Sequence, residues 1–154
     1  MKDEGAAKML PDVEIYTDGS CRNERGGYCA LLLRGGEREE IVGVCEEPTN
    51  SARMELVAVI AALRVLPQPC YVVIRTDSQY VASNFSKLRQ WQADGTLEGD
   101  EARANADLWL ALREASAPHT VIIEWIRGHA ECVENQYCHR QAKLAAMSPL
   151  TAAG

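Results

Sequence analysis

The chain lacks the features that mark several broad classes of protein. Its 154 residues contain no apolar run near the roughly 20 residues of a membrane-spanning helix, which argues against a membrane protein. Its six cysteines show no C-x-x-C spacing, which argues against a zinc site of that kind. Positive charge is also scarce, because 16 lysines and arginines face 22 acids, a formal net charge of −6. Such a chain binds nucleic acid only where its positive charge is local.

The composition that is present predicts one globular domain. Hydrophobic residues make up 47 % and charged residues 25 % of a chain long enough to bury its own core. We expect a single domain over residues 13–147, with short flexible tails at 1–12 and 148–154. The segment 1–11 contains no apolar stretch typical of a signal peptide. The cysteines fit reduced thiols better than a disulfide framework, so we expect a cytoplasmic protein without a membrane partner.

Apolar periodicity and turn residues predict the order of strands and helices. Expected strands span 13–17, 28–34, 39–45, 71–76 and 120–126, and expected helices span 52–66, 78–85, 87–91, 105–116 and 134–147. Gly35-Gly36 predicts a hairpin, and the continuous apolar run 71–76 predicts a strand that is buried on both faces. The order predicts an α/β fold with a five-stranded mixed sheet, three antiparallel strands and then two parallel ones, flanked by helices.

One short motif occurs twice, at the ends of two expected strands. Ile15-Tyr16-Thr17-Asp18-Gly19 and Ile74-Arg75-Thr76-Asp77-Ser78 both close a β-prone run with Thr-Asp and a small residue. Open α/β sheets bind ligands at the carboxyl ends of their strands. If the two strands are neighbours, the carboxylates of Asp18 and Asp77 repel by roughly 4 kcal/mol at about 4 Å and an effective dielectric near 20. Such a pair predicts a cation between the charges, and oxygen ligands suit Mg²⁺ or Mn²⁺.

A third acid, Glu55, lies on the expected helix 52–66. It shares its face with apolar residues: Val59, Ala62 and Leu63. An ionised carboxylate in such a stripe is costly unless it is paired or bound to a metal, and Ala52 rules out a capping box. For this helix alone, the alternative is a buried ion pair with an arginine: Arg53, Arg64 or Arg75. Taken together with the two aspartates, Glu55 is better interpreted as a metal ligand.

Five motifs stand in a fixed order along the chain. They are Thr17-Asp18-Gly19-Ser20, Arg53-Met54-Glu55-Leu56, Thr76-Asp77-Ser78-Gln79-Tyr80-Val81, Asp107-Leu108-Trp109 and Gly128-His129-Ala130, with Glu134-Asn135 at the head of the last helix. In this order the chain resembles bacterial type 1 ribonuclease H from about Val13 to Met147. The resemblance implies the ribonuclease H-like fold and a monomer without an obligate protein partner. It also implies an endoribonuclease that cuts the RNA strand of RNA/DNA hybrids, leaving 5′-phosphate and 3′-hydroxyl ends.

The resemblance implies a role for each of several residues. Asp18, Glu55 and Asp77 would hold two divalent ions for in-line hydrolysis, with Asp18 bridging both ions. His129 resembles the family's histidine that assists proton transfer or product release. Six residues are expected to bind substrate: Gly19, Ser20, Asn23, Thr49, Gln79 and Trp91. Among them, Gln79 would reach base edges, while main-chain groups of Gly19 and Ser20 would read the 2′-hydroxyl that distinguishes RNA from DNA.

One position departs from the family pattern. The family carries an aspartate near the start of the last helix, in a pattern like Asn-Glu-x-Cys-Asp, where this chain has Asn135-Gln136-Tyr137-Cys138-His139. We therefore expect His139 to replace the fourth acid as a catalytic residue and metal ligand. Imidazole suits Mn²⁺ and later metals better than Mg²⁺, so Mn²⁺ would be preferred. The alternative is that His139 is a solvated helix residue and that Glu131 or Glu134 supplies the ligand.

The segment expected to bind the DNA strand has an unusual charge. Between residues 90 and 106, one arginine stands against four acids, a net charge of −3. Fewer phosphate contacts would give weak binding with a shallow dependence on salt. Three other functions are open: a hybrid-binding protein without catalytic activity, another nuclease of the same superfamily, and a cation-binding α/β protein unrelated to nucleic acid.

Overall fold

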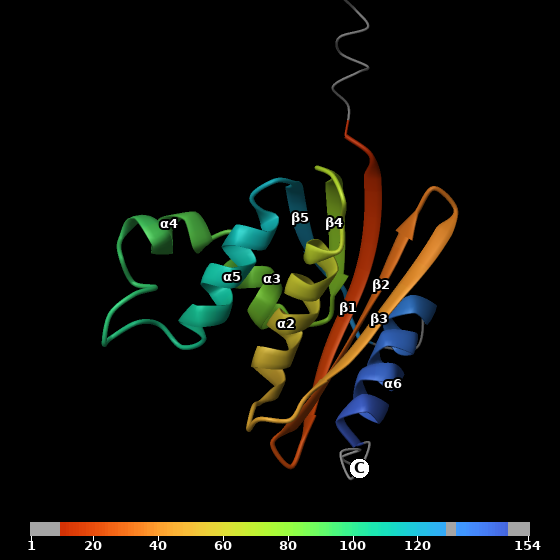
Figure 1. Ribbon diagram of the computed structural model, residues 1–154, viewed down its shortest axis with the longest axis horizontal. Helices are drawn as coiled ribbons and strands as arrows, with labels where there is room; N and C mark the ends of the chain where they lie inside the picture. Colours follow the sequence, from red (N-terminus) through yellow and green to blue (C-terminus); the bar gives the residue numbers. More distant parts are fainter. Residues whose placement is uncertain (1–9, 129–131, 148–154) are drawn as a thin grey trace, which may run out of the picture.

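The computed structural model describes residues 10–128 and 132–147, which form a five-stranded sheet with helices on both faces (Figure 1). The strands are β1 (Asp12–Arg22), β2 (Arg25–Arg34), β3 (Glu37–Cys45), β4 (Tyr71–Thr76) and β5 (Thr120–Trp125). Their order across the sheet is β3-β2-β1-β4-β5. The first three strands pair antiparallel, whereas β4 pairs parallel with both β1 and β5. The predicted mixed sheet is confirmed.

Two faces of the sheet carry different helices. The helices are α2 (Ser51–Arg64), α3 (Gln79–Phe85), α4 (Leu88–Ala93), α5 (Ala106–Ser116) and α6 (Val133–Met147). Figure 1 shows α2 and α6 on opposite sides of β1, with α4 standing away from the sheet beyond α5. No helix of the described residues is long and apolar enough to cross a membrane.

Side-chain caps fix the starts of two helices near the sheet. Asn50 caps α2, because its Oδ1 accepts from the Arg53 N–H at 2.9 Å. Ser78 caps α3 in the same way, through a 3.1 Å bond from the Val81 N–H to its Oγ. Both caps satisfy N–H groups that the first turn of a helix leaves unpaired. The two helices begin at Ser51 and Gln79, each within one residue of the expected start.

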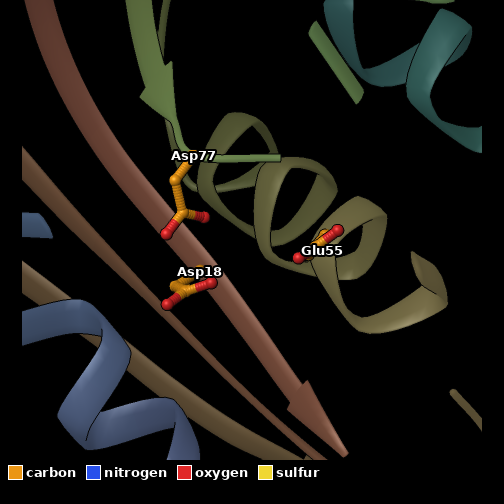
Figure 2. A group of neighbouring side chains, drawn as sticks. All are labelled: Asp18, Glu55 and Asp77. Carbon is orange, nitrogen blue, oxygen red and sulfur yellow. The ribbon is translucent and has the colours of Figure 1, made fainter. Parts of the chain in front are cut away.

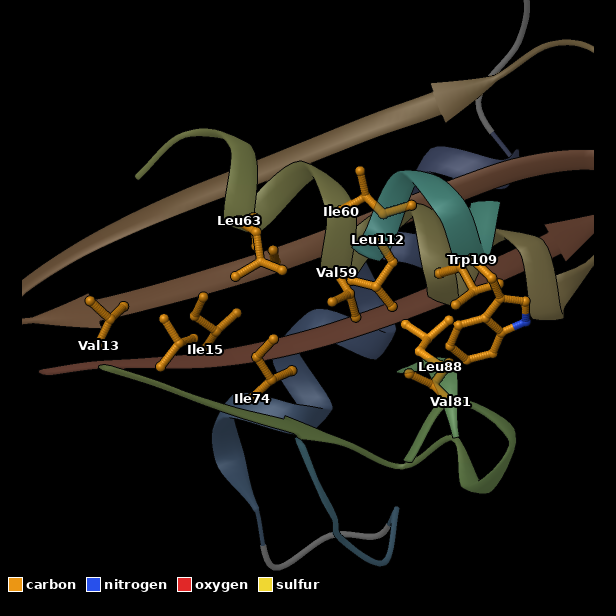
Figure 3. Packing of buried hydrophobic residues seen from close by; sticks show 14 of the residues in the cluster. Val13, Ile15, Val59, Ile60, Leu63, Ile74, Val81, Leu88, Trp109 and Leu112 are labelled. Atoms are coloured by element: carbon orange, nitrogen blue, oxygen red, sulfur yellow. The ribbon is translucent and has the colours of Figure 1, made fainter. Parts of the chain in front are cut away.

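The main core lies between the sheet and the layer of α2 and α5. Ile15 and Ile74 from neighbouring parallel strands meet Val59 and Leu63 of α2, and Trp109 of α5 is fully buried at the other end of the same cluster, near Leu88 (Figure 3). A second, smaller cluster lies under α6 and consists of Cys29, Leu31, Cys138 and Ala142. The residues that α6 buries are mostly small, so this helix lies close to β1, the strand that carries Asp18.

The prediction that Tyr71–Thr76 is buried on both faces is wrong. Val72, Ile74 and Thr76 are buried, whereas the alternate residues of β4 are only half-buried. The reason is that α6 packs chiefly on β1, β2 and β3 and leaves this face of β4 open. Arg75 lies on the open face, where its guanidinium pairs with Glu14 at 2.6 Å and with Glu124 at 3.1 Å.

Strand β1 is longer than the sequence predicts and continues through Asp18 to Arg22. Its pairing with β4 stops at Thr17 and Thr76, but its pairing with β2 continues to the tight turn at Asn23 and Glu24. Asp18 therefore lies within a strand, while Asp77 follows the end of one.

Candidate active site

Three carboxylates from separate elements meet at one place. Asp18 lies on β1, Glu55 on α2 and Asp77 directly after β4 (Figure 2). Parallel pairing of Thr17 with Thr76 brings the two aspartates side by side. One oxygen from each acid lies within 4.8 Å of the others. The proximity that the repeated Thr-Asp motif predicts is confirmed, and Glu55 joins the pair.

Gly19 explains how Glu55 comes so close to β1. A Cβ atom at position 19 would lie 2.4 Å from the carbonyl carbon of Met54 and 2.5 Å from the backbone nitrogen of Glu55. Only glycine lets the first turns of α2 approach the strand at this distance. The glycine of the first motif therefore serves the geometry of the acid cluster.

The acids are crowded and partly removed from water. Burial, followed by the nearby charge of Asp77, raises the pKa of Asp18 from 3.8 to about 6. Burial also raises the pKa of Glu55 from 4.5 to about 7, and both aspartates add to the rise. Like charges this close disfavour one another's ionised form unless a cation lies among them. Three converging carboxylates are the hard oxygen donors that Mg²⁺ and Mn²⁺ take, so the residues fit a divalent metal site.

The alternative of an ion pair for Glu55 finds no support. Arg53 pairs with Asp107 through two contacts of 2.7 and 3.0 Å, and Arg75 pairs with Glu14 and Glu124. Arg64 lies at the far end of α2, roughly 13 Å along the axis from position 55 at 1.5 Å per residue. Glu55 instead accepts a hydrogen bond from Ser78, which partly offsets the rise of its pKa.

His139 lies beside the cluster, on α6. Its Nδ1 atom is 2.9 Å from Oδ2 of Asp18, while the Gly19 N–H donates to Oδ1 at 2.9 Å. Among the described residues, the ligand atoms that gather come from Asp18, Glu55 and Asp77, without His139 or Glu134. The structure thus brings His139 to Asp18 but not into the group of metal-ligand atoms. His129 and Glu131 lie outside the described residues.

A cavity of about 330 Å³ opens next to the acids. It is lined by Asp77, Gly128, Asn135, Gln136, His139, Arg140 and Lys143. Arg140 and Lys143 are exposed and lie three residues apart, on one side of α6. They place two positive charges at the edge of the cavity beside the carboxylates.

Comparison with known proteins decides which family has this arrangement. The family model described as RNase H matches residues 11–147, nearly the whole chain. The chain belongs to the ribonuclease H family. It is a metal-dependent endoribonuclease of the type 1 group, which acts on RNA/DNA hybrids.

Individual relatives agree with the family match. The ribonuclease H of Cupriavidus metallidurans is 47 % identical over 124 residues, which cover 78 % of this chain and 85 % of the relative. The ribonuclease H of Escherichia coli is 41 % identical over 145 residues, 92 % of this chain and 93 % of the relative. Among solved structures, LC9-RNase H1 superposes with a TM-score of 0.79 at 30 % identity, covering 89 % of this chain and 72 % of that one. The ribonuclease H-like fold is therefore confirmed.

The expected substrate-binding residues of this ribonuclease H fall into two groups. Gly19, Ser20 and Gln79 adjoin the acid cluster, and Gln79 is exposed as the first residue of α3. Asn23 and Thr49 lie near each other, because the Thr49 N–H donates to the carbonyl of the residue after Asn23 at 2.9 Å. Their contacts with substrate stay predictions.

Trp91 lies in a different setting from the other predicted residues. It is 8 % exposed, meets Trp109 edge-on with ring centroids 5.6 Å apart, and is covered by the guanidinium of Arg103 at 4.3 Å. The structure does not bring it to the carboxylates. Its visible role is to pack α4 and the following loop against α5, and its contact with substrate stays a prediction.

Trp125 is one of the residues at this site that the sequence analysis did not single out. The indole N–H of Trp125, at the end of β5, donates to the carbonyl oxygen of Asp77 at 3.1 Å. The parallel pairing of Thr76 with Trp125 places the two residues side by side. This contact could have been predicted only from the register between β4 and β5, which the sequence does not give.

Proposed function

We propose that this ribonuclease H hydrolyses the RNA strand of a hybrid with two divalent ions, and that His139 occupies the place of the family's fourth acid. The observation that carries the proposal is the meeting of Asp18, Glu55 and Asp77, with His139 bonded to Asp18. The products are a 5′-phosphate and a 3′-hydroxyl.

The three acids hold the cations in this proposal, and Asp18 is shared between them. When bound, two divalent ions activate the attacking water and stabilise the leaving 3′ oxygen. Asp18 would be the ligand common to both ions; it is the most buried of the acids and interacts with Asp77 and His139. Glu55 and Asp77 complete the separate sites. His129 assists proton transfer or release of product.

His139 sets the preferred metal. A neutral imidazole in place of a carboxylate leaves the site with three negative charges, which weakens binding of one Mg²⁺, while Mn²⁺ accepts nitrogen ligands more readily. Its contact with Asp18 supports this placement. LC9-RNase H1, which is 30 % identical to this chain, is a type 1 RNase H with the type 2 active-site motif, so another member of the type has an unusual site.

The hybrid lies across the acids and the cavity beside them. Arg140 and Lys143 hold phosphates of the RNA strand, and Gln79 reaches base edges in the minor groove. Gly19 and Ser20 read the ribose hydroxyl next to the cut. We also propose that the enzyme works in the cytoplasm, since its cysteines are free thiols suited to a reducing compartment. The family resemblance implies that it acts as a monomer.

Cleavage of labelled duplexes tests this function. The protein is incubated with an RNA/DNA hybrid, an RNA/RNA duplex and a DNA/DNA duplex, each labelled on one strand, in Mg²⁺ and in Mn²⁺. We expect cuts in the RNA strand of the hybrid alone, with 5′-phosphate ends. The matched control is Asp18→Asn, which keeps the size of the side chain and removes its charge. Equal cutting by this variant, or cutting of all three duplexes, contradicts the proposal.

A further inference from the structure

Asp77 differs from the other two acids in what holds its side chain. Asp18 is bonded to the Gly19 N–H and lies against His139, and Ser78 donates to Glu55. From the part of the chain that the structure describes, no hydrogen bond reaches the Asp77 carboxylate. Among the described residues, none uses a lone pair of the Asp77 oxygens, so the direction of this carboxylate depends on contacts of another kind.

The main chain on both sides of Asp77 is fixed. Thr76 ends β4, and its carbonyl accepts from the Ile126 N–H at 2.8 Å. Ser78 caps α3, and its own N–H donates to Oγ1 of Thr76 at 3.0 Å. Asp77 is thus the single residue between the end of a strand and the cap of a helix.

The end of β5 and the segment after it contact Asp77 twice. The Trp125 indole donates to its carbonyl oxygen at 3.1 Å, although the tryptophan is 43 % exposed and is not held there by burial. At Gly128, an added Cβ would lie 2.4 Å from Oδ2 of Asp77 and 3.0 Å from its Cβ. The glycine is explained by space, because any side chain at position 128 would displace the carboxylate.

We propose that Trp125 and Gly128 are positioning residues that aim the Asp77 carboxylate at the metal site. Trp125 fixes the main chain of Asp77 by donating to the Asp77 carbonyl oxygen. Gly128 packs against the Asp77 carboxylate and limits the directions in which it can turn. Neither contact donates to the carboxylate oxygens, so the acid is held in place without losing its capacity as a ligand. The inference rests on the metal site of the proposed function. Outer partners of metal ligands typically change metal affinity 10–100-fold when they are altered.

Metal binding by the free protein tests the role of Trp125. The variant Trp125→Phe keeps an aromatic ring and removes the N–H. We measure the rise in melting temperature as Mn²⁺ is added without any nucleic acid, and expect the midpoint of that rise to move to roughly tenfold higher Mn²⁺. The matched control is Trp109→Phe, which removes an indole N–H bonded to Tyr80 at 3.0 Å in the core. The control is expected to melt earlier but to keep the wild-type Mn²⁺ midpoint.

A second variant keeps the test decisive. Gly128→Ala places a methyl group against the Asp77 carboxylate and is expected to raise the Mn²⁺ midpoint as well. In an Asp77→Asn background, Trp125→Phe is expected to add no further change. An unchanged midpoint in Trp125→Phe, or an equal change in the Trp109→Phe control, overturns the inference. Because no hybrid is used, this result is independent of whether the wild-type protein cuts RNA.

Discussion

The Nδ1 atom of His139 lies 2.9 Å from Oδ2 of Asp18, so a side chain that is 61 % exposed contacts a carboxylate that is 4 % exposed. The contact connects the position at which this chain departs from the family pattern with the most buried acid of the site. The preceding residue, Cys138, is buried against the sheet, where its Sγ lies 3.6 Å from that of Cys29. Any change of charge at position 139 therefore acts directly on Asp18.

Restoring the family's acid is expected to destabilise the metal-free protein. In His139→Asp, a fourth carboxylate joins a cluster in which burial and neighbouring aspartates already raise the pKa values of Asp18 and Glu55. We expect the free energy of unfolding in chelator to fall by about 1–3 kcal/mol. Thermal and urea melts measure the change, and His139→Asn serves as the neutral control of the same size. If the aspartate and asparagine variants are equally stable, repulsion at this position is absent.

The same substitution is expected to change the metal preference. With a carboxylate at position 139, one Mg²⁺ gains an oxygen ligand and a negative charge, so activity at low Mg²⁺ should rise relative to activity at low Mn²⁺. The ratio of initial cleavage rates in the two metals, compared between wild type and His139→Asp, measures this effect. An unchanged ratio would assign His139 to a solvated position without influence on the ions.

The stability of the metal-free protein is expected to decrease as the pH rises from about 4 to about 7. The pKa values of Asp18 and Glu55 are raised to about 6 and about 7 in the folded state, above their ordinary values of 3.8 and 4.5. Across this window the folded protein keeps protons that the unfolded chain has lost, so the contribution of these acids is present at low pH and disappears as the folded groups ionise.

Urea unfolding at pH 5.0 and pH 7.5 in chelator measures this pH dependence. Glu55→Gln removes one of the two groups, so the difference in unfolding free energy between the two pH values should shrink. Saturating Mg²⁺ should shrink it in the wild type too, because a bound cation favours the ionised acids. A pH dependence that is the same in wild type and Glu55→Gln, with or without Mg²⁺, contradicts the assignment.

Charge reversal on the loop after α4 is expected to strengthen binding of the hybrid. Glu98 and Glu101 are exposed in a segment with a net charge of −3, so Glu98→Lys with Glu101→Lys should lower KM and leave kcat unchanged. The slope of log KM against log salt should steepen by about one for each further phosphate that the new lysines neutralise. Glu37→Lys with Glu39→Lys, two exposed charge reversals at the start of β3, is the control. An equal effect in the control would show that only net charge matters.

Most of the fold could be predicted because its elements carry local signals. The Gly35-Gly36 turn, the caps Asn50 and Ser78 and the apolar run of β4 each mark a boundary that the structure keeps within a few residues. The open face of β4 could not be predicted, because coverage by α6 depends on how far a helix near the end of the chain reaches across the sheet. The full length of β1 was missed for a similar reason, since only pairing with β2 extends it.

The acid cluster could be predicted from the repeated Thr-Asp motif and from Glu55, an acid on an otherwise apolar helix face. Contacts between distant segments could not, because they depend on register and on small packing distances. The bond between Trp125 and Asp77 follows from pairing of β4 with β5. The family pattern predicted His139 at the site, but its contact with Asp18, outside the group of metal-ligand atoms, depends on the position of α6 on the sheet. The burial of Trp91 was missed because a tryptophan beside basic residues has the same pattern whether it faces solvent or core.

Single-turnover cleavage of a hybrid labelled on its RNA strand tests the proposed function most directly. The wild-type protein is assayed in Mg²⁺ and in Mn²⁺, and binding of the same hybrid is measured in parallel. We predict cleavage of the RNA strand in both metals, faster in Mn²⁺ at low metal concentration, and loss of cleavage but not of binding in Asp18→Asn. Intact RNA in both metals, with the hybrid still bound, would contradict this prediction and leave a hybrid-binding protein without catalytic activity.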